Sequence, residues 1–339
     1  MSVIEFYRSR PGRLVPGLVQ ALLVAAAAFA LQHIPGLHFL SPLIIAAVLG
    51  IAWRCIVGVS EAGQAGVAFA AKALLRLAII LLGLQISIGQ IVGMGWVGFI
   101  VAGFALVSTF CFTLWFGRLI GADPALVELI AAGTSVCGAS AIVATNTVTR
   151  ADDADVAYAL GCITLFGTLA VIVYPVLMVI LNLAPAEYGL WVGASIHEVA
   201  QVVAAGFQGG HEAGDAATIV KLIRVLMLAP LLLALGWFRP GVDAAASASR
   251  RVGVPGFVLG FIAMVILNSL VPLPPVMSQG AALLTLGLLT VSLAAIGLMT
   301  SFAHVLRRGM KPLAVAAAAT LFIAITCLVL SKLFAAAVL

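Results

Sequence analysis

The chain has 339 residues, of which 64% are hydrophobic and only 9% are charged. Soluble domains carry about 25% charged residues, so 17 Lys and Arg with 12 Asp and Glu are too few to cover a soluble fold. This composition excludes a soluble globular enzyme, a disordered chain and, despite a formal net charge of +5, a nucleic-acid-binding protein. The basic residues instead separate apolar runs of about 20 residues, the length that spans a bilayer.

Eleven apolar segments follow one another with short connections. The alternating ten-residue pattern of a membrane β-barrel is absent, and helices satisfy their own backbone hydrogen bonds in lipid. We therefore predict an all-α polytopic membrane protein with about eleven transmembrane helices. The approximate spans are 14–31, 39–57, 71–89, 95–117, 124–147, 155–181, 188–207, 216–236, 254–271, 278–302 and 312–336.

The positions of Lys and Arg predict the orientation. With the N-terminus in the cytoplasm, all the basic residues except Arg150, Lys221, Arg224 and Lys332 fall on the cytoplasmic side. Cytoplasmic loops carry the excess of Lys and Arg, so we expect a cytoplasmic N-terminus and an outside C-terminus. A cleavable signal ending at Ala28-Phe29-Ala30 stays an alternative. The first apolar run is longer than a usual signal core, which favours an uncleaved helix.

The last ten segments contain a weak repeat. Gly98-Phe99 opens the fourth segment as Gly256-Phe257 opens the ninth, and Ser135 in the fifth corresponds to Thr290 in the tenth. Each repeat would contain five helices, an odd number of membrane crossings. The second copy must therefore be inverted in the membrane, as in many secondary transporters. We predict three parts: residues 1–38 with an extra N-terminal helix, 39–182 as the first repeat and 188–336 as the second.

The fifth segment is predicted to be interrupted near its middle. It reads Gly133-Thr134-Ser135-Val136-Cys137-Gly138-Ala139-Ser140, and two glycines with three hydroxyls weaken a helix. A break would expose backbone N–H groups at a half-helix N-terminus, where anions bind. The alternative is a continuous helix that uses small residues for tight packing. We expect a fainter break in the tenth segment, around Thr290 and Ser292.

The missing acids and the polar seventh segment suggest the transported species. A cation antiporter would need carboxylates at the centre of the fifth segment, but the only acid in this segment, Glu128, lies in its first turn and none lies at its centre. This favours an anion. In the seventh segment, His197, Glu198 and Gln201 lie in an apolar run, and an acid inside a membrane is a functional candidate because its charge is costly there. We expect Glu198, with or without His197, to couple protons or to gate. A satisfied polar pair is the alternative.

Two further readings of these charges stay open. His197-Glu198-x-x-Gln201 resembles the zinc motif His-Glu-x-x-His, but Gln201 replaces the second histidine that the metal needs. A membrane metalloenzyme is therefore a remote alternative, and we expect no metal, no cofactor and no catalytic residues. Lys72 with Arg76 and Lys221 with Arg224 begin the third and eighth segments. Such cations could attract an anion at both mouths or reach lipid headgroups.

Two motifs resemble a known family. Gly133-Thr134-Ser135-Val136-Cys137-Gly138-Ala139-Ser140-Ala141-Ile142 and Gly193-Ala194-Ser195-Ile196-His197-Glu198-Val199-Ala200-Gln201-Val202 resemble the bacterial sulfate exporter (YeiH-like) family, and the resemblance covers nearly the whole chain. It implies a multi-pass protein of the bacterial inner membrane. More distantly, the chain resembles the sodium/proton antiporter and bile-acid symporter superfamily, which implies two crossing broken helices.

Together these features predict a secondary transporter that moves a small anion across the inner membrane, in the outward direction. Sulfate, sulfite and organosulfonates are the expected substrates, with a proton or sodium ion as the coupling ion and the bilayer as the surrounding partner. The predicted binding residues are Gly133, Thr134, Ser135, Cys137, Gly138, Ser140, Thr290 and Ser292. A passive anion channel is the second reading, and a homodimer is left open.

Overall fold

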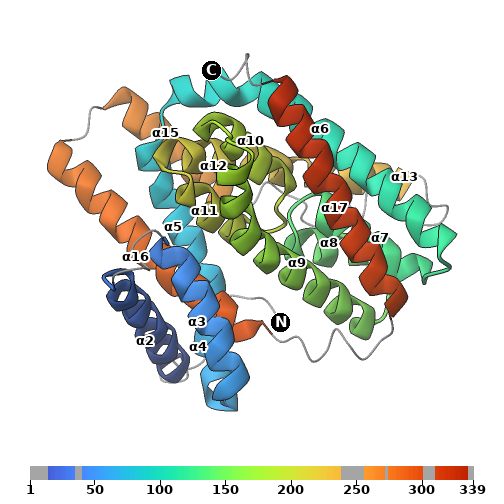
Figure 1. The fold of residues 1–339 in the computed structure, drawn as a ribbon, viewed down its shortest axis with the longest axis horizontal. Helices are drawn as coiled ribbons and strands as arrows, with labels where there is room; N and C mark the ends of the chain where they lie inside the picture. Colours follow the sequence, from blue (N-terminus) through green and yellow to red (C-terminus); the bar gives the residue numbers. More distant parts are fainter. Residues whose placement is uncertain (1–13, 35–39, 238–255, 272–273, 301–309, 335–339) are drawn as a thin grey trace. The chain divides into compact units, whose positions relative to one another are not determined.

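A computed structural model describes residues 14–34, 40–237, 256–271, 274–300 and 310–334, and within these ranges the regular structure is entirely helical (Figure 1). Each of the eleven predicted segments contains helix. Among the described residues, seven helices are long and apolar enough to cross a membrane, and four further apolar helices are shorter. The chain is therefore a multi-pass membrane protein, while the number of eleven crossings stays a prediction.

The helices divide into two compact units. The first comprises residues 1–88 and 256–301, and the second comprises residues 89–255 and 302–339. Each unit takes segments from both predicted repeats, because the break points between units fall inside the repeats. The repeats and the boundaries 1–38, 39–182 and 188–336 stay predictions.

The first unit is built on close helix contacts at glycines. Its helices are α2 (Val15–Gln32), α3 (Pro42–Ile56), α4 (Glu61–Phe69), α5 (Leu75–Leu82), α15 (Gly256–Leu270) and α16 (Pro275–Met299), with a π-helical turn, η2 (Ala70–Leu74), between α4 and α5 and a short 3-10 turn, η3 (Gly83–Gln85), after α5. A side chain at Gly50 of α3 would collide with the carbonyl of Ala294, and one at Gly297 of α16 would collide with that of Ala47. Small residues at both positions let these two backbones approach closely.

Helix α16 corrects the prediction for the tenth segment. It runs without interruption from Pro275 to Met299. The hydroxyls of Thr290 and Ser292 donate to the carbonyls of Leu286 and Leu288, each four residues earlier, at 2.7 Å. Because a buried hydroxyl can bond to its own helix backbone in this way, Ser and Thr alone do not interrupt a helix, and the predicted break at Thr290–Leu293 is wrong.

The second unit contains the remaining described helices. They are α6 (Ile88–Leu119), α7 (Pro124–Ser135), α8 (Ala139–Thr149), α9 (Asp153–Ile180), α10 (Pro185–Ser195), α11 (Val199–Gln208), α12 (His211–Leu226), α13 (Leu228–Trp237) and α17 (Met310–Leu333). Helix α10 is buried continuously from Tyr188 to Ser195 and anchors the core. Its Trp191 stacks on Tyr174 of α9, with ring centroids 4.0 Å apart, and donates its indole N–H to the Ala324 carbonyl of α17 at 2.8 Å.

Many residues behind the predicted orientation lie outside the described ranges. These are Arg8, Arg10, Arg13, Arg239, Arg250, Arg251, Arg307 and Arg308. The cytoplasmic N-terminus and the outside C-terminus therefore stay predictions.

Candidate functional site

The predicted break in the fifth segment is confirmed. Asp123 caps α7 by accepting hydrogen bonds from the N–H groups of Ala125 and Leu126 at 2.9 and 3.0 Å, and Pro124 occupies the first turn. The helix ends at Ser135, and α8 begins at Ala139. Gly138 between them has a φ of +70°, a conformation that glycine adopts without steric cost.

The seventh segment is also interrupted, which the sequence reading did not predict. Helix α10 ends at Ser195 and α11 begins at Val199, so Ile196, His197 and Glu198 form the connection. The signal was present in Glu198 and Gln201, because Gln201 stands at the third helical position and its side-chain oxygen accepts from the Glu198 N–H at 3.0 Å. Such reciprocal capping marks a helix start.

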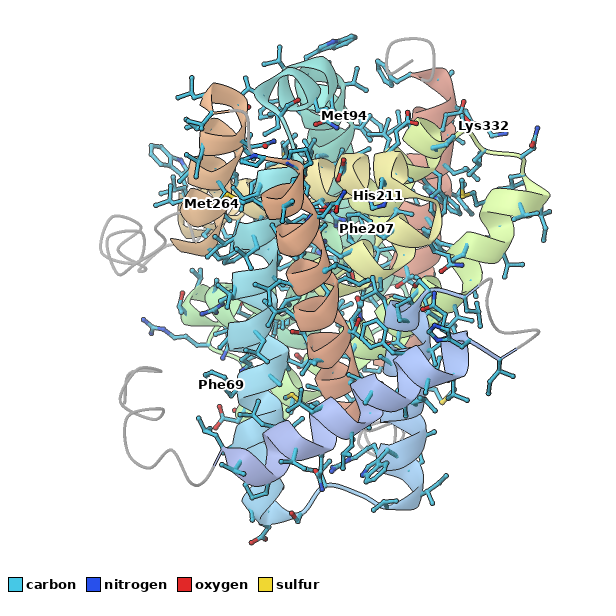
Figure 2. All side chains as sticks on the ribbon, turned by 90° about the vertical axis from the view of Figure 1, so that its left-hand side faces the viewer. Phe69, Met94, Phe207, His211, Met264 and Lys332 are labelled. Atoms are coloured by element: carbon cyan, nitrogen blue, oxygen red, sulfur yellow. The ribbon has the colours of Figure 1, made fainter. Side chains whose placement is uncertain are left out.

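Two glycines bring α10 against α12, and the two helices lie together with α11 in Figure 1. Side chains at Gly189 and Gly193 would press on the carbonyls of Ala213 and Ala217 of α12. Close packing of this kind needs glycine on at least one helix. At the other end of α11, Phe207 and His211 lie next to each other at the turn into α12, with ring centroids 5.9 Å apart (Figure 2).

Lys221 of α12 lies between the two interruptions. Its side chain is fully buried. The ammonium donates to the Val136 carbonyl at 2.9 Å, to the Ile196 carbonyl at 2.8 Å, and to the His197 carbonyl. These oxygens stand where α7 and α10 end, so a single side chain satisfies carbonyl groups that both helices leave without partners.

Arg224, one turn later on α12, bonds to the same two helix ends. Its guanidinium donates to the Thr134 and Ser135 carbonyls of α7 at 2.8 and 3.3 Å. It also donates to the carbonyl of Gly193 in α10 at 3.3 Å and to that of Ile196, just after α10, at 3.0 Å. It is also fully buried. The predicted place of Lys221 and Arg224 at an outer mouth is therefore wrong, because both side chains are directed at backbone carbonyls in the interior.

The opposite ends of the interruptions meet at Glu198. A side chain at Gly138 would lie 2.6 Å from the Glu198 Cγ and 3.4 Å from one of its carboxylate oxygens. Glu198 precedes the first residue of α11, so its carboxylate lies beside the N-termini of both α8 and α11. Glu198 is half-buried and Ser140 is exposed, whereas Lys221 and Arg224 are enclosed. The N-terminal ends of the half-helices are thus the more accessible side of this site.

His197 and Gln201 hold the second connection in place. The imidazole Nε2 of His197 lies 3.0 Å from the hydroxyl of Thr320 on α17. That hydroxyl donates to Ala316 at 2.8 Å, which leaves its oxygen to accept from the histidine N–H. Gln201 lies against Gly167 of α9, where a side chain would overlap its amide. His197 and Glu198 therefore contact different neighbours.

Residues 136–138 form the first connection, between α7 and α8. The hydroxyls and the thiol in and around it differ in whether they form hydrogen bonds. Ser135 donates to Ala131 within α7 at 2.6 Å. The Cys137 sulfur and the Ser140 hydroxyl are 2.8 Å apart. Thr134 is buried, and its hydroxyl has no hydrogen-bond partner among the residues that the structure describes. Gly133 fits against Ile142 and Ile163, where a larger residue would not.

The other predicted site residues belong to the first unit. Thr290 and Ser292 are buried in α16. Lys72, in the π-helical turn, and Arg76, in α5, are exposed, and their attraction of anions stays a prediction. Within the described residues, no group of three or more His, Cys, Asp or Glu side chains could hold a metal ion.

The charges at the site match the polarity of the helix ends. The C-termini of α7 and α10, which carry partial negative charge, bind Lys221 and Arg224. The N-termini of α8 and α11, which carry partial positive charge, lie beside Glu198. Glu198 and Lys221 are within electrostatic reach of each other.

Comparisons with known proteins place the chain in a family. The profile described as Conserved hypothetical protein 698 matches residues 16–316. A UPF0324 membrane protein of Pseudomonas aeruginosa is 38% identical over 323 residues, 90% of each chain. One from Staphylococcus epidermidis is 32% identical over 94% of this chain and 96% of its own. One from Bacillus cereus is 36% identical over 87% of each chain.

Proposed function

Since this chain belongs to the UPF0324 family of membrane proteins, we propose that it is a secondary transporter for a small anion. The observation that carries the proposal is the meeting of two interrupted helices, α7–α8 and α10–α11, in one unit. Secondary transporters bind substrates at such interruptions, because half-helix ends present free backbone groups and partial charges inside the membrane.

The charge balance favours an anion. The site contains the buried cations Lys221 and Arg224 and one nearby acid, Glu198. Two half-helix N-termini, at Ala139 and Val199, add partial positive charge on the accessible side. The resemblance of the sequence motifs to sulfate exporters makes sulfate, sulfite and organosulfonates the expected substrates, and export across the inner membrane the expected direction.

Glu198 supports coupling to protons. Its carboxylate already lies beside the two N-termini that an anion would use, so an ionised Glu198 and a bound anion would repel each other. Protonation of Glu198 would remove that repulsion, so the affinity for the anion would depend on the protonation of Glu198. The other ionisable groups around the site are Lys221 and Arg224 from α12, Cys137 from the first connection and His197 beside Glu198.

Proteoliposomes provide the test. Radiolabelled sulfate, sulfite, taurine and small carboxylates are offered under imposed proton or sodium gradients. We expect accumulation of one anion class against its own gradient, driven by a proton gradient. Flux that follows only the membrane potential and the anion gradient would indicate a passive channel. Absence of flux for every anion would contradict the proposal.

Replacement of Glu198 by Gln tests the coupling role. Glu198→Gln keeps the shape and removes the ionisable group, so we expect a folded protein that binds the anion but no longer responds to a pH gradient. The measurement is transport at several imposed pH gradients, beside wild type. Glu61→Gln is the matched control, because Glu61 is an exposed acid at the start of α4. An unchanged pH response in Glu198→Gln would make Glu198 a structural residue.

A further inference from the structure

The two interrupted helices present a cluster of carbonyl oxygens to one point. Val136 follows the end of α7, and Ile196 and His197 follow the end of α10. The three carbonyls converge on the Lys221 ammonium, with distances of 2.9 Å to Val136 and 2.8 Å to Ile196. Backbone segments more than 50 residues apart in sequence thus contribute oxygens to one buried position.

Such a cluster has the chemistry of an alkali-cation site. Half-helix C-termini carry partial negative charge, and in sodium-coupled transporters unwound carbonyls and half-helix C-terminal ends coordinate the ion. A lysine ammonium is a compact single positive charge with three N–H donors and no acceptor. It therefore satisfies three carbonyls in the way a bound monovalent cation would.

We propose that Lys221 takes the place of a sodium ion between these two interrupted helices. The carbonyl cluster is then a cation site whose cation is covalently attached, and sodium has no place to bind there in the native chain. The proposal deepens the proposed function by excluding sodium as the coupling ion at these interruptions. It assigns sodium-binding capacity to the Val136, Ile196 and His197 carbonyls once the lysine is removed.

Neighbouring groups fit this assignment. Glu198, Cys137 and Cys327 are near enough to Lys221 to interact with its charge. The Arg224 guanidinium donates separately to the carbonyls of Thr134, Ser135, Gly193 and Ile196. Removal of Lys221 therefore leaves both helix ends still joined by Arg224, while the carbonyls of Val136 and His197 lose their partner.

The test measures thermal unfolding of the purified full-length chain in detergent, in sodium chloride and in choline chloride of equal ionic strength. Wild type is expected to have the same Tm in both salts. Lys221→Ala is expected to melt lower in choline by about 5 °C or more, with a saturable recovery of most of that loss in sodium. Lys221→Met is the matched control, because its longer apolar side chain fills the space and leaves no room for the ion. It is expected to melt lower in both salts alike.

Binding of radiolabelled sodium gives a second measurement. We expect saturable binding of sodium to Lys221→Ala, and we expect wild type to lack this binding. A sodium-specific rise in the Tm of wild type would overturn the proposal. So would equal melting of Lys221→Ala in both salts, or a Lys221→Ala protein that folds in neither. None of these measurements requires a transported anion, so they separate this proposal from the transport function.

Discussion

At the scale of single residues, Gly138 combines two requirements. Its φ of +70° lies in the left-handed region, and a side chain there would meet the Glu198 Cγ at 2.6 Å. The first requirement allows the chain to leave α7 and start α8. The second allows Glu198 to approach the N-terminus of α8. Conformation and contact therefore both restrict this position to glycine.

Replacement of Gly138 should harm both stability and transport. Gly138→Ala places an L-residue at positive φ, which costs about 1–2 kcal/mol, and displaces Glu198. We expect a lower Tm and a slower transport rate in proteoliposomes. Gly287→Ala is the control, because a side chain at Gly287 in α16 meets nothing within 4 Å, and alanine favours a helix by about 0.8–1.0 kcal/mol. Its Tm should be equal or higher. A Gly138→Ala variant indistinguishable from wild type would mean that the connection tolerates a side chain.

At the scale of the helix, the interruptions are stable because α12 supplies donors to both. Six carbonyls, three at each helix end, accept hydrogen bonds from Lys221 and Arg224. A buried carbonyl without a partner costs about 1–3 kcal/mol. An arginine suits this position because its planar fork spreads its donors in fixed directions over separate acceptors, whereas a lysine has all three donors on one nitrogen.

Arg224→Lys tests the importance of that fork. Lysine has three N–H donors where arginine has five. The substitution should therefore leave one or more of the Thr134, Ser135 and Gly193 carbonyls without a partner, at a cost of about 1–3 kcal/mol for each. We expect a lower Tm in detergent. Arg76→Lys, at an exposed arginine of α5, should change the free energy of unfolding by less than about 0.5 kcal/mol. Equal effects of the two substitutions would show that charge, rather than the fork, matters at Arg224.

The helix scale also explains why the seventh segment is interrupted at its centre and the tenth is continuous. Hydroxyls in α16 find acceptors on their own helix, and a mid-helix glycine such as Gly287 weakens a helix without breaking it. The break at Ile196–Glu198 instead follows from donors on another helix, Lys221 and Arg224. Composition within one segment does not reveal those partners.

At the scale of the whole molecule, the orientation remains the property to measure. The bias of Lys and Arg predicts a cytoplasmic N-terminus and an outside C-terminus. Reporter fusions after Arg10 and after Leu339 should therefore give opposite signals, and a fusion after Arg150, predicted to lie outside, should match the one after Leu339. Matching signals at the two chain ends would contradict the predicted odd number of crossings or indicate cleavage of the first segment.

The sequence by itself determined the membrane class, the helical segments and an interruption in the fifth segment, which the structure has at residues 136–138. Hydropathy over about 20 residues and a local Gly, Ser and Thr cluster act within one segment, so the chain order reveals them. It also marked His197 and Glu198 as unusual, because charged or ionisable groups are costly in apolar runs.

Only the tertiary structure decided what those residues contact. Lys221 and Arg224 read as exposed mouth cations in the sequence, yet they are buried and bonded to backbone atoms about 25 to 90 residues away. Glu198 lies against Gly138 because α10 packs on α12 through glycines and brings the two interruptions together. A carbonyl oxygen carries no sequence signal, since every residue has one, so a site built from backbone ends becomes visible only when the helices are folded against each other.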